Sequence, residues 1–422
     1  MLVRERGDTN EIMENVLNLE YDRAAMDAYK KQCLSDTLHN ALENTEYYRP
    51  YRDLLKTESD PYKILKQIPT INKQDLVDNP HAFVNVNQKG VTIKNCTSGT
   101  SGIPVTIRQD LRTVKIEQAF VSRYLQQAGY VKGDKRAWIR AELIVPLASK
   151  QPPYWRYSYF ENMMLMSSFH LTNQSIPLYL KALERFGTQI IQATPSSILA
   201  LAKYLEANDA YYQGTLKSII TSSEWLPPEM RHIVEERFKC KVFDWYGLSE
   251  RVASAGLCEH GRYHINEDYS YVELDPVGDN RFEIIGTNFI NHLYPILRYR
   301  TGDFVTITSE GPCQCGKVTP SFDYIEGRVC DYITDKLGNN VSSVAHISKG
   351  IHGLLDTQII QHSENTIEAH VVVNEAFDSH QQDLLIAKCK LKLGESMNVI
   401  IKEVEQIPRT ENGKVIQVIS NM

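Results

Sequence analysis

Apolar residues recur along the chain with two different periods, and the period changes where the expected architecture changes. Near the N-terminus, Leu34, Leu38, Ala41 and Leu42 fall at i, i+4, i+7 and i+8, a single stripe that predicts an amphipathic helix. From about residue 90 to 300, short β-rich runs such as LKSIITSS and KVFDWYG alternate with helical stretches such as PPEMRHIVEERF, and Gly or Pro marks each change. This alternation favours α/β layering, with helices packed against a sheet.

The pattern turns to strands after about residue 265, and it changes again near 332. The runs YSYVELD, RFEIIGT and ILRYRTGDFVTIT alternate with turn signals and predict a β-rich subregion. Beyond it, TQIIQ, TIEAHVVVN and MNVIIKEVE read as strands and QQDLLIAKCKLKL as a helix, which together predict a compact α+β unit. We therefore expect an α/β protein with a large multi-subdomain domain over 1–328 and a small α+β domain over 329–422.

Composition and charge exclude several classes of protein. The chain has 422 residues, 42% of them apolar, and 46 Lys and Arg face 52 Asp and Glu, a formal charge of −6. These values are typical of soluble globular proteins, and the lack of a basic tail disfavours nucleic acid or an anionic membrane as a partner. The longest apolar runs, Leu143–Ala148 and Met163–Met166, are far shorter than a membrane helix requires. The N-terminus has no apolar segment typical of a secretory signal.

The eight cysteines are scattered through a long chain, which favours reduced thiols in a cytoplasmic protein over a disulfide framework. They are Cys33, Cys96, Cys240, Cys258, Cys313, Cys315, Cys330 and Cys389. Most of them are expected to pack as small apolar residues.

A run of small hydroxyl residues between glycines lies at residues 95–104, after a predicted strand and before a predicted helix. Backbone N–H groups and hydroxyl donors in such a loop can wrap a polyphosphate. The Gly-Lys-Ser/Thr ending of a Walker A loop is missing, and such a stretch alone is more often an ordinary flexible loop. The candidate phosphate-binding residues are Thr97, Ser98, Gly99, Thr100, Ser101 and Gly102.

Four further segments follow this loop in a fixed order, and together they resemble the signatures of adenylate-forming enzymes. They are DWYGLSE at 244–250, YRTGD at 299–303, IEGR at 325–328 and PRTENGKV at 408–415. Within that superfamily the chain most resembles the phenylacetate–coenzyme A ligases, which share its compact length, the segment IPTINKQDLVDNP, the TPSS at 194–197 and the Cys-x-Cys-Gly at 313–316. The resemblance extends over nearly the whole chain.

The resemblance implies a two-step reaction and its cofactors. A carboxylate attacks the α-phosphate of ATP, which gives an acyl-adenylate and pyrophosphate, and a thiol, most often that of coenzyme A, then displaces AMP. The first step needs no general base, because a carboxylate is already ionised at neutral pH. The C-terminal domain is expected to rotate between the two steps. The implied partners are a small-molecule carboxylic acid and, as further candidates, a carrier protein with its phosphopantetheine thiol and a second copy of the chain.

The resemblance also implies a role for each motif residue. The loop residues 97–102 would hold the phosphates, Glu250 would hold Mg²⁺, and Asp303 would accept hydrogen bonds from the ribose hydroxyls. Lys414 would neutralise charge that builds between the acid and the α-phosphate, with Arg328 near the ribose and phosphate. Trp245 and Tyr246 would flank the adenine, and Ser222, Ser223 and Glu224 would form its other wall. Asp244 and Gly247 complete the residues expected to bind the nucleotide.

Each of these residues also has an ordinary structural interpretation. Lys414 follows Asn412-Gly413, a common hairpin turn, and a lysine there is usually a solvated surface charge. Asp303 after Gly302 is typical of a turn, and Glu250 alone is typical of a surface carboxylate. The five motifs in order favour the functional interpretation, most of all for Asp303, Glu250 and Lys414.

Cysteine and histidine spacing predicts a structural zinc site. Cys313 and Cys315 lie in a Gly- and Pro-bounded loop, and Cys258 and His264 lie in an upstream segment in which His264 opens a strand-like run. Together they give the Cys₃His set of a closed tetrahedral site. His260 is the alternative to His264. Relatives with the Cys-x-Cys-Gly loop resemble zinc binders. The competing interpretation is a group of reduced structural cysteines.

The acid is expected between the phosphate loop and the adenine wall, where the sequence is less informative. Candidate residues are Trp138, Phe169, His170 and Ala193, with Tyr154 and Trp155 beside them. The aromatic cluster at 152–160 is equally typical of a proline-bounded loop packed on the core. The resemblance favours an aryl or arylacetic acid, and a charged side chain at Arg140, Glu142 or Arg156 would favour a polar substituent on it.

The chain departs from the resemblance after the IEGR segment. Residues 330–343 lack the usual paired acidic residues, and Asp331 is the remaining candidate for the hinge. The acceptor of the second step therefore stays open between coenzyme A, a carrier-protein thiol and an amine. A non-catalytic nucleotide-binding protein is a further alternative, which the joint presence of Lys414, Glu250 and Asp303 disfavours.

Overall fold

The computed structural model describes the chain in two compact units, each built from two separate segments. It describes residues 19–88, 91–96, 105–140, 142–146, 148–328, 333–334, 340–341, 347, 351–408, 416 and 418–421. Unit 1 comprises residues 1–130 and 243–326, and unit 2 comprises 131–242 and 327–422. The expected division into 1–328 and 329–422 stays a prediction.

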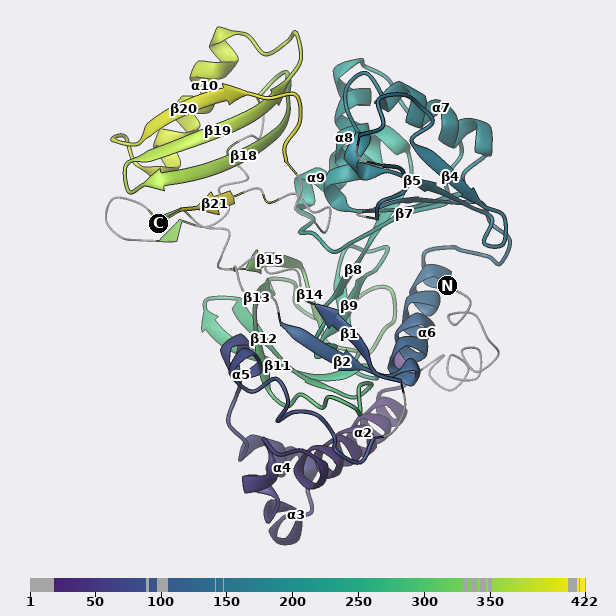
Figure 1. Ribbon diagram of the computed structural model, residues 1–422, viewed down its shortest axis with the longest axis vertical. Helices are drawn as coiled ribbons and strands as arrows, with labels where there is room; N and C mark the ends of the chain where they lie inside the picture. Colours follow the sequence, from purple (N-terminus) through teal and green to yellow (C-terminus); the bar gives the residue numbers. More distant parts are fainter. Residues whose placement is uncertain are drawn as a thin grey trace. The chain divides into compact units, whose positions relative to one another are not determined.

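Unit 1 begins with helices that confirm the first apolar stripe. Leu34, Leu38, Ala41 and Leu42 are fully buried in α2. Asp22 precedes this helix, and its side chain accepts the Ala25 N–H at 3.0 Å, an N-cap that satisfies one of the free N–H groups. The helical elements of this unit are η1 Leu19–Tyr21, α2 Arg23–Asn44, η2 Arg49–Tyr51, α3 Leu54–Thr57, α4 Pro61–Lys66, α5 Lys73–Asp78 and α6 Leu111–Gln127 (Figure 1).

The strands of unit 1 form two larger groups and one hairpin. An antiparallel sheet has the order β11-β12-β13-β15, a second group contains β14-β10-β9-β8, and β1 pairs with β2. β8 and β15 cross the boundaries of the unit. The strands are β1 Ile93–Cys96, β2 Thr106–Gln109, β8 Lys241–Gly247, β9 Ser254–Leu257, β10 Tyr263–Ile265, β11 Ser270–Gly278, β12 Arg281–Asn288, β13 Tyr299–Thr306, β14 Ser321–Phe322 and β15 Tyr324–Arg328.

The first part of unit 2 confirms the α/β layering. Its strands have the order β7-β6-β3-β5-β4; β7, β6, β3 and β5 run parallel, and β4 is antiparallel to β5. Helices α7, α8 and α9 share one apolar core with these strands. The elements are β3 Arg136–Ile139, β4 Trp155–Ser158, β5 Met163–Met166, η3 Ser168–His170, α7 Ile176–Phe186, β6 Ile190–Ala193, α8 Pro195–Ala207, β7 Ser218–Ser222 and α9 Pro228–Phe238.

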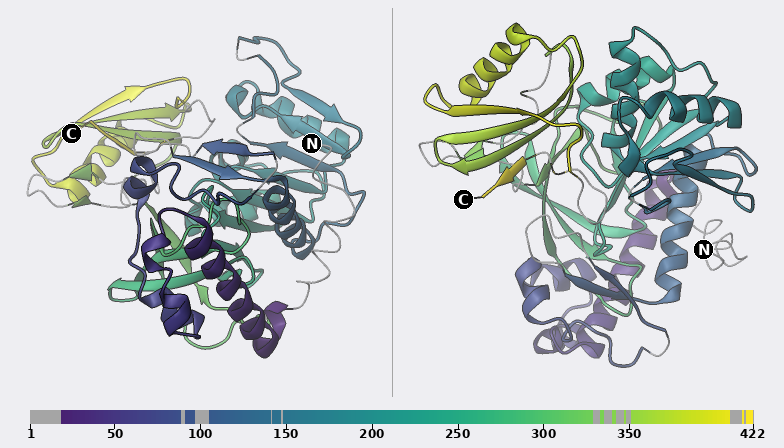
Figure 2. Two further views of the ribbon diagram at one scale, coloured as in Figure 1. Left: turned by 60° about the horizontal axis from the view of Figure 1, so that its bottom comes forward. Right: turned by 45° about the horizontal axis from the view of Figure 1, so that its top comes forward.

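The second part of unit 2 is the α+β arrangement expected near the C-terminus. A four-stranded sheet has the order β20-β19-β18-β21, and α10 packs on one of its faces with a core of its own (Figure 2). The elements are β16 Ile333–Thr334, β17 Asn340–Val341, β18 Leu354–Ser363, β19 Thr366–Val373, α10 Ser379–Leu393, β20 Asn398–Glu403 and β21 Val418–Ser420.

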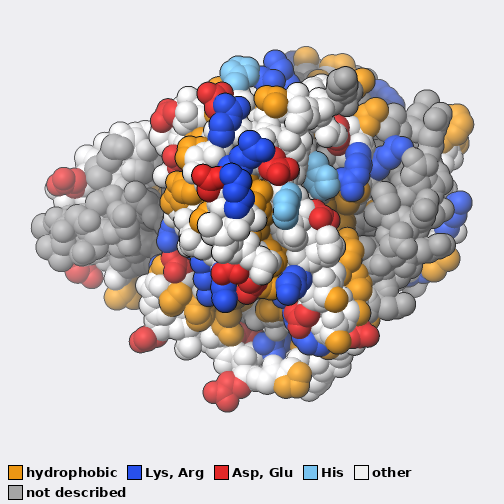
Figure 3. All heavy atoms as spheres, turned by 90° about the horizontal axis from the view of Figure 1, so that it is seen from below, with side chains coloured by type: hydrophobic (Ala, Val, Ile, Leu, Met, Phe, Trp, Pro, Cys, Tyr) orange, Lys and Arg blue, Asp and Glu red, His pale blue; other side chains and the backbone are white. Residues whose placement is uncertain are grey.

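Surface charge agrees with the balance expected from the sequence. On the face seen from the end where α3 and α4 lie, Lys and Arg side chains are interspersed with Asp and Glu (Figure 3). None of the described helices has the length and apolar character needed to cross a membrane.

Candidate functional site

The carboxyl ends of the parallel strands in unit 2 carry most of the residues predicted for the acid and for one adenine wall. Ser223 follows β7, Ala193 ends β6, Trp138 lies near the end of β3, and His170 lies in η3 just after β5. Since parallel strands end at one edge of a sheet, these residues share that edge. Open α/β sheets bind their ligands at this edge, so the predicted residues are placed where a ligand is expected.

The turn after β7 is strained and held by its neighbours. Ser223 has φ +77°, a value that is uncommon for a residue other than glycine, and the Arg140 guanidinium donates to its Oγ. The next residue, Glu224, accepts the Ser196 backbone N–H at 2.9 Å with Oε2. Ser196 lies in the first turn of α8, where N–H groups have no partner within the helix and a negative charge is favourable. Glu224 thus ties the turn to the start of α8.

The predicted acid-site residues differ in how they are held. Trp138 donates from Nε1 to Glu142 at 2.6 Å, and the Arg140 guanidinium lies 4.8 Å from the Trp138 ring centroid. His170 stacks on Tyr154 with centroids 4.7 Å apart, and its Nδ1 is 2.8 Å from the Ser167 hydroxyl. Arg140 therefore contacts both the Trp138 ring and the turn after β7. Of the two remaining candidates, Phe169 is half-buried and Ala193 is fully buried.

In unit 1, the DWYG segment forms the end of β8, and its side chains alternate between the two faces of the strand. Buried Asp244 accepts the Tyr263 hydroxyl at 2.8 Å, and Tyr246 donates its hydroxyl to Asp303 at 2.8 Å. Trp245 packs on Tyr124 of α6, with ring centroids 5.2 Å apart. Of the two aromatic residues expected at the adenine, Tyr246 is therefore the one that contacts Asp303. Gly247, which ends the strand, is exposed.

Burial and charge also set the ionisation of Tyr124. Burial raises its pKa well above the usual value, and the nearby Asp244 carboxylate raises it further. Its hydroxyl donates to the Asp244 carbonyl at 2.7 Å, with the Leu257 carbonyl 2.9 Å away. Tyr124 therefore stays protonated and connects α6 to β8 and β9.

Asp303 lies in an irregular stretch of β13. Its pairing with β12 skips between Glu283, opposite Phe304, and Ile285, opposite Arg300, so the intervening residues 301–303 bulge. Gly302 has φ +70°, which glycine adopts without the penalty of a side chain. Thr301 accepts the Asp303 N–H at 3.0 Å and donates to the Ile284 carbonyl at 2.8 Å. The RTGD sequence thus builds a bulge that orients a buried carboxylate.

Glu250 is buried as well, and Tyr299 donates its hydroxyl to Glu250 Oε1 at 3.3 Å. Tyr299 is the first residue of the RTGD strand. Glu250 and Asp303 are therefore each held by a tyrosine that belongs to the other residue's motif. Sequence reasoning gave neither Tyr299 nor Thr301 a role. The alternation of buried and less buried positions along β13 could have identified both residues, because it places residues 299, 301 and 303 on the buried side.

Several predicted site residues lie outside the described residues. These are the loop residues Thr97, Ser98, Gly99, Thr100, Ser101 and Gly102, the hinge candidate Asp331 and the C-terminal Lys414. The backbone of Arg328 ends β15, and its side chain also lies outside the description.

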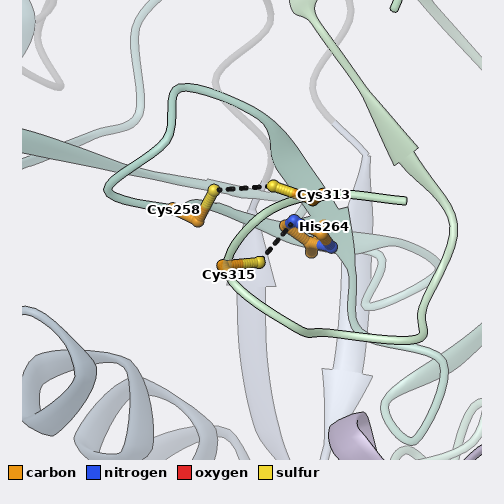
Figure 4. Close-up of side chains that lie close together, drawn as sticks. All are labelled: Cys258, His264, Cys313 and Cys315. Carbon is orange, nitrogen blue, oxygen red and sulfur yellow. Dashed lines mark hydrogen bonds between the residues drawn. The ribbon is translucent and has the colours of Figure 1, made fainter. Parts of the chain in front are cut away.

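The four predicted zinc ligands come together in unit 1. Their ligand atoms, from Cys258, His264, Cys313 and Cys315, all lie within 4.8 Å of one another (Figure 4). Cys258 and Cys313 have their sulfur atoms 3.7 Å apart, close to the roughly 3.8 Å expected for two thiolates about 2.3 Å from one tetrahedral ion. Cys315 Sγ is 3.2 Å from His264 Nε2. The alternative ligand His260 is exposed.

Two similar turns position these ligands. The Gly261 N–H donates to the Cys258 carbonyl at 3.0 Å, and the Gly316 N–H donates to the Cys313 carbonyl at 3.2 Å. Both glycines have positive φ, +84° and +81°, which closes each turn tightly. His264 lies in the middle of β10, between its partner strands β9 and β14. A cysteine turn and a strand histidine from one hairpin therefore face a second cysteine turn.

Burial shifts the protonation of the side chains in the cluster. Burial, with a smaller contribution from Lys317, lowers the His264 pKa to about 4, which keeps the imidazole in the neutral form that binds metals. Burial raises the Cys315 pKa to about 12, and it also raises that of Cys258. For Cys313, burial raises the pKa, but donors from Cys315 and Cys258 lower it by more. The described cysteines are free, and four soft and borderline ligands fit a zinc ion.

The fold matches that of solved acyl-coenzyme A ligases. A structure of 2-hydroxyisobutyryl-CoA ligase in the postadenylation state superposes with a TM-score of 0.69, at 17% identity, over 96% of this chain and 91% of that chain. This likeness shows that the two chains share a fold.

Sequence comparison extends this likeness to particular relatives. Phenylacetate-coenzyme A ligase of Pseudomonas putida is 24% identical over 94% of this chain and 95% of its own length. Protein CapK of Staphylococcus aureus is 25% identical over 90% of this chain and 86% of its own length. The CapK C-terminal domain model matches residues 333–421. The chain is therefore similar to phenylacetate-coenzyme A ligases and to CapK along most of its length.

Proposed function

We propose that the chain is an AMP-forming acid–coenzyme A ligase. It activates a small-molecule carboxylic acid with ATP as an acyl-adenylate, releases pyrophosphate, and transfers the acyl group to the thiol of coenzyme A. The observation that carries this proposal is the pair of buried motif carboxylates, Glu250 and Asp303, each of which accepts a tyrosine hydroxyl. The likeness to phenylacetate-coenzyme A ligases along 94% of the chain supports the same reaction.

In the first step, one oxygen of the substrate carboxylate attacks the α-phosphorus of ATP, and the bond from that phosphorus to the bridging oxygen of pyrophosphate breaks. Asp303, oriented by the bulge, accepts hydrogen bonds from the ribose hydroxyls. Glu250 holds Mg²⁺, a hard cation that prefers carboxylate and phosphate oxygens. The loop 97–102 holds the leaving phosphates, and Lys414 and Arg328 offset the negative charge that gathers at the α-phosphate.

In the second step, the thiol sulfur attacks the acyl carbon, the bond to the phosphate oxygen of AMP breaks, and the thiol proton leaves to solvent. The products are a thioester and AMP. We assign coenzyme A as the acceptor because the relatives with whole-chain likeness include enzymes named as coenzyme A ligases. A carrier-protein thiol or an amine is the competing acceptor.

The acid itself is proposed to be an aryl or arylacetic acid. Two aromatic side chains at the carboxyl edge of the sheet, Trp138 and Phe169, support an aromatic ring, and His170 stacks within the same group of residues. Arg140 lies against Trp138 and brings a cation to this edge. An acid that carries a hydroxyl or a second anionic group on the ring would suit such a guanidinium.

We further propose that the Cys₃His cluster binds one structural zinc ion. Four protein ligands close a tetrahedral sphere, so the ion would stabilise the two turns and leave no position open for substrate.

A measurement of AMP release distinguishes the three candidate acceptors. The purified chain is incubated with Mg²⁺, ATP and a panel of aryl and alkyl acids, and coenzyme A, a phosphopantetheinylated carrier protein or an amine is then added. We expect AMP and an acyl-coenzyme A product, identified by mass, with at least one aromatic acid. AMP release that requires an amine or carrier protein instead would reassign the second step, and no AMP with any combination would oppose the proposed function.

A further inference from the structure

The turn between β4 and β5 exposes two consecutive aromatic side chains, and the proposed reaction gives them no role. β4 pairs antiparallel with β5, and residues 159–162 form the turn that joins them (Figure 1). Within this turn, Tyr159 is 89% exposed and Phe160 is fully exposed. We call this pair the aromatic tip. One or two exposed apolar residues are ordinary, so the tip forms an interaction surface only if neighbouring segments extend it.

The turn that carries the aromatic tip is anchored to the rest of its unit. Asn162 has φ +48°, a left-handed conformation that asparagine tolerates better than most residues. Its side-chain amide donates to the Gly133 carbonyl at 2.7 Å, and its own carbonyl accepts the Arg136 N–H at 3.1 Å. The turn is therefore tied to the segment that leads into β3, and the exposure of the tip belongs to a fixed turn.

Apolar side chains from neighbouring segments extend the aromatic tip into a patch. Tyr157 of β4 is 48% exposed, and its ring centroid lies 5.5 Å from that of Phe186 at the end of α7. Val131 is 62% exposed and lies two residues before Gly133, which Asn162 contacts. The apolar patch thus has members from two segments and is continuous with the end of α7. Its exposed members are Val131, Tyr157, Tyr159 and Phe160.

Exposed cations border the apolar patch. Lys135 Nζ lies 5.4 Å from the Phe186 ring centroid, and both Lys132 and Arg185 are exposed. The acidic side chains of the same region are buried or half-buried, and they are Asp134 (paired with Lys217 at 2.7 Å), Glu161 and Glu184. The whole chain has a formal charge of −6, so the attraction for an anionic partner is local to this region.

We propose that this region is a contact surface for an anionic lipid membrane. Tyrosine and phenylalanine rings fit the boundary between headgroups and acyl chains, and lysine and arginine lay their stems along apolar surface while their charges reach lipid phosphates. Peripheral binding of this kind gains both from the buried apolar area and from the attraction to anionic lipids. A hairpin turn is convex, and lipid headgroups close around it without a preformed pocket.

The direction of the strands places this surface away from the candidate acid site. The parallel strands β3 and β5 begin at Arg136 and Met163, next to the turn, and end at the edge that carries Trp138 and Ser223. A membrane at the amino edge of the sheet therefore leaves the carboxyl edge open to ligands dissolved in water. The proposed contact uses none of the residues assigned to the reaction.

Co-sedimentation with vesicles tests the proposal. The purified full chain is mixed with vesicles of phosphatidylcholine, either alone or with an equal part of phosphatidylglycerol. We expect the wild type to sediment with the anionic vesicles, more than with the neutral ones, and to be released as salt rises. The double variant Tyr159→Ser, Phe160→Ser should bind at least about tenfold more weakly, because the apolar contact is lost.

Val277→Ser is the matched control, because Val277 is an exposed apolar residue beside another hairpin turn, that of β11 and β12, and it should bind as the wild type does. The tip variant should unfold at the wild-type temperature, since both of its altered side chains are exposed, which separates lost binding from lost folding. A wild type that stays in the supernatant with both kinds of vesicle would overturn the proposal and favour a protein partner. A tip variant that binds like the wild type would overturn it too.

A second double variant tests the cations. Lys132→Gln, Arg185→Gln should lose most of the preference for anionic over neutral vesicles, because it removes two of the exposed charges that border the patch. A preference equal to that of the wild type would overturn the electrostatic part of the proposal.

Fluorescence tests whether the aromatic tip enters the bilayer. Phe160→Trp should gain blue-shifted emission with anionic vesicles and quenching by brominated acyl chains, relative to the wild type with its four native tryptophans. Val277→Trp should gain neither. Equal quenching of both variants would overturn the assigned surface. None of these readouts requires ATP or an acid, so a failed membrane contact and a failed ligase assignment are distinguishable.

Discussion

Asp303 and Glu250 show how the motif residues differ from ordinary surface carboxylates. They are 5% and 3% exposed, and each accepts a hydrogen bond from a tyrosine hydroxyl, Tyr246 for Asp303 and Tyr299 for Glu250. Burial removes competing water, so hydrogen bonds to these carboxylates are stronger than at the surface. Each of these carboxylates is therefore held in place by a tyrosine from the other motif.

Replacing Asp303 by alanine should weaken the use of ATP. A hydrogen bond to a charged group contributes about 1.5–3 kcal/mol, so Asp303→Ala should lower kcat/KM for ATP by about 10- to 150-fold. The measurement is the initial rate of pyrophosphate release at varied ATP concentration.

Tyr246→Phe is the matched control for this prediction, because it removes only the hydroxyl that orients Asp303. The Tyr246 hydroxyl contacts the Asp303 carboxylate, so its removal should act only through the orientation of Asp303, and the loss should stay smaller than that of Asp303→Ala. A value of kcat/KM for ATP in Asp303→Ala that equals the wild-type value would remove the carboxylate from the nucleotide site.

At the scale of elements, two cysteine turns and one strand histidine form the proposed zinc site. We expect about one equivalent of zinc per purified chain, because four protein ligands close a tetrahedral site. Cys313→Ser should lose most of this zinc and unfold at a lower temperature, since metal binding stabilises the fold that positions its ligands. Elemental analysis and thermal unfolding give the two readouts.

Cys240→Ser is the control, because Cys240 is a free thiol of unit 2, whereas the cluster belongs to unit 1. It should retain zinc. Less than about half an equivalent in the wild type would contradict the zinc assignment and leave a group of reduced structural cysteines.

A buried charge network ties the first helical turn to the loop that carries Cys313 and Cys315. Glu20 lies 2.6 Å from Lys317 and 4.0 Å from Arg123, and its carbonyl accepts the Val318 N–H at 2.8 Å. Burial raises the pKa of Glu20, but Arg123 and Lys317 together lower it by more, so the pKa falls below its usual value. The ionised carboxylate therefore stabilises the folded chain.

This network predicts a pH dependence of stability. Because the folded-state pKa of Glu20 is lowered, its contribution is fully present above the unfolded pKa, about 4.3, and is lost as pH falls through the folded value. Glu20→Gln should therefore lower the free energy of unfolding most at neutral pH, and the difference from wild type should shrink below about pH 4. Urea unfolding at several pH values measures it; a difference that grows on acidification would contradict the network.

For the whole molecule, the sequence pattern predicted the helices and strands better than the contacts that each of them makes with its neighbours. The stripe at residues 34–42, the alternation from 90 to 300 and the C-terminal α+β texture all match the structure, because periodicity reflects which face of an element is buried. The bulge at residues 301–303 was not predictable, since it depends on the register between β12 and β13. The different contacts of Trp245 and Tyr246 follow from the alternation of β8, which the motif alone did not reveal.

In the candidate site, too, some features could be predicted from the sequence and others could not. The convergence of Cys258, His264, Cys313 and Cys315 could be predicted from the spacing of cysteine and histidine, and zinc binding by this cluster stays a proposal. The hydrogen bonds that orient Asp303 and Glu250 could not, because each joins residues far apart in the sequence through the way the strands are arranged. Residues 97–102, Asp331 and Lys414 lie outside the described residues, so their roles stay predictions.

The most direct test of the proposed adenylation is acid-dependent exchange of pyrophosphate into ATP. We predict exchange by the wild type with at least one aromatic acid, and a loss of about 10²-fold or more in Lys414→Ala, because a preorganised transition-state contact is removed. Lys402→Ala is the matched control, since Lys402 is an exposed lysine of β20 near Glu368, and it should exchange like the wild type. Absence of exchange with every acid tested would contradict the account.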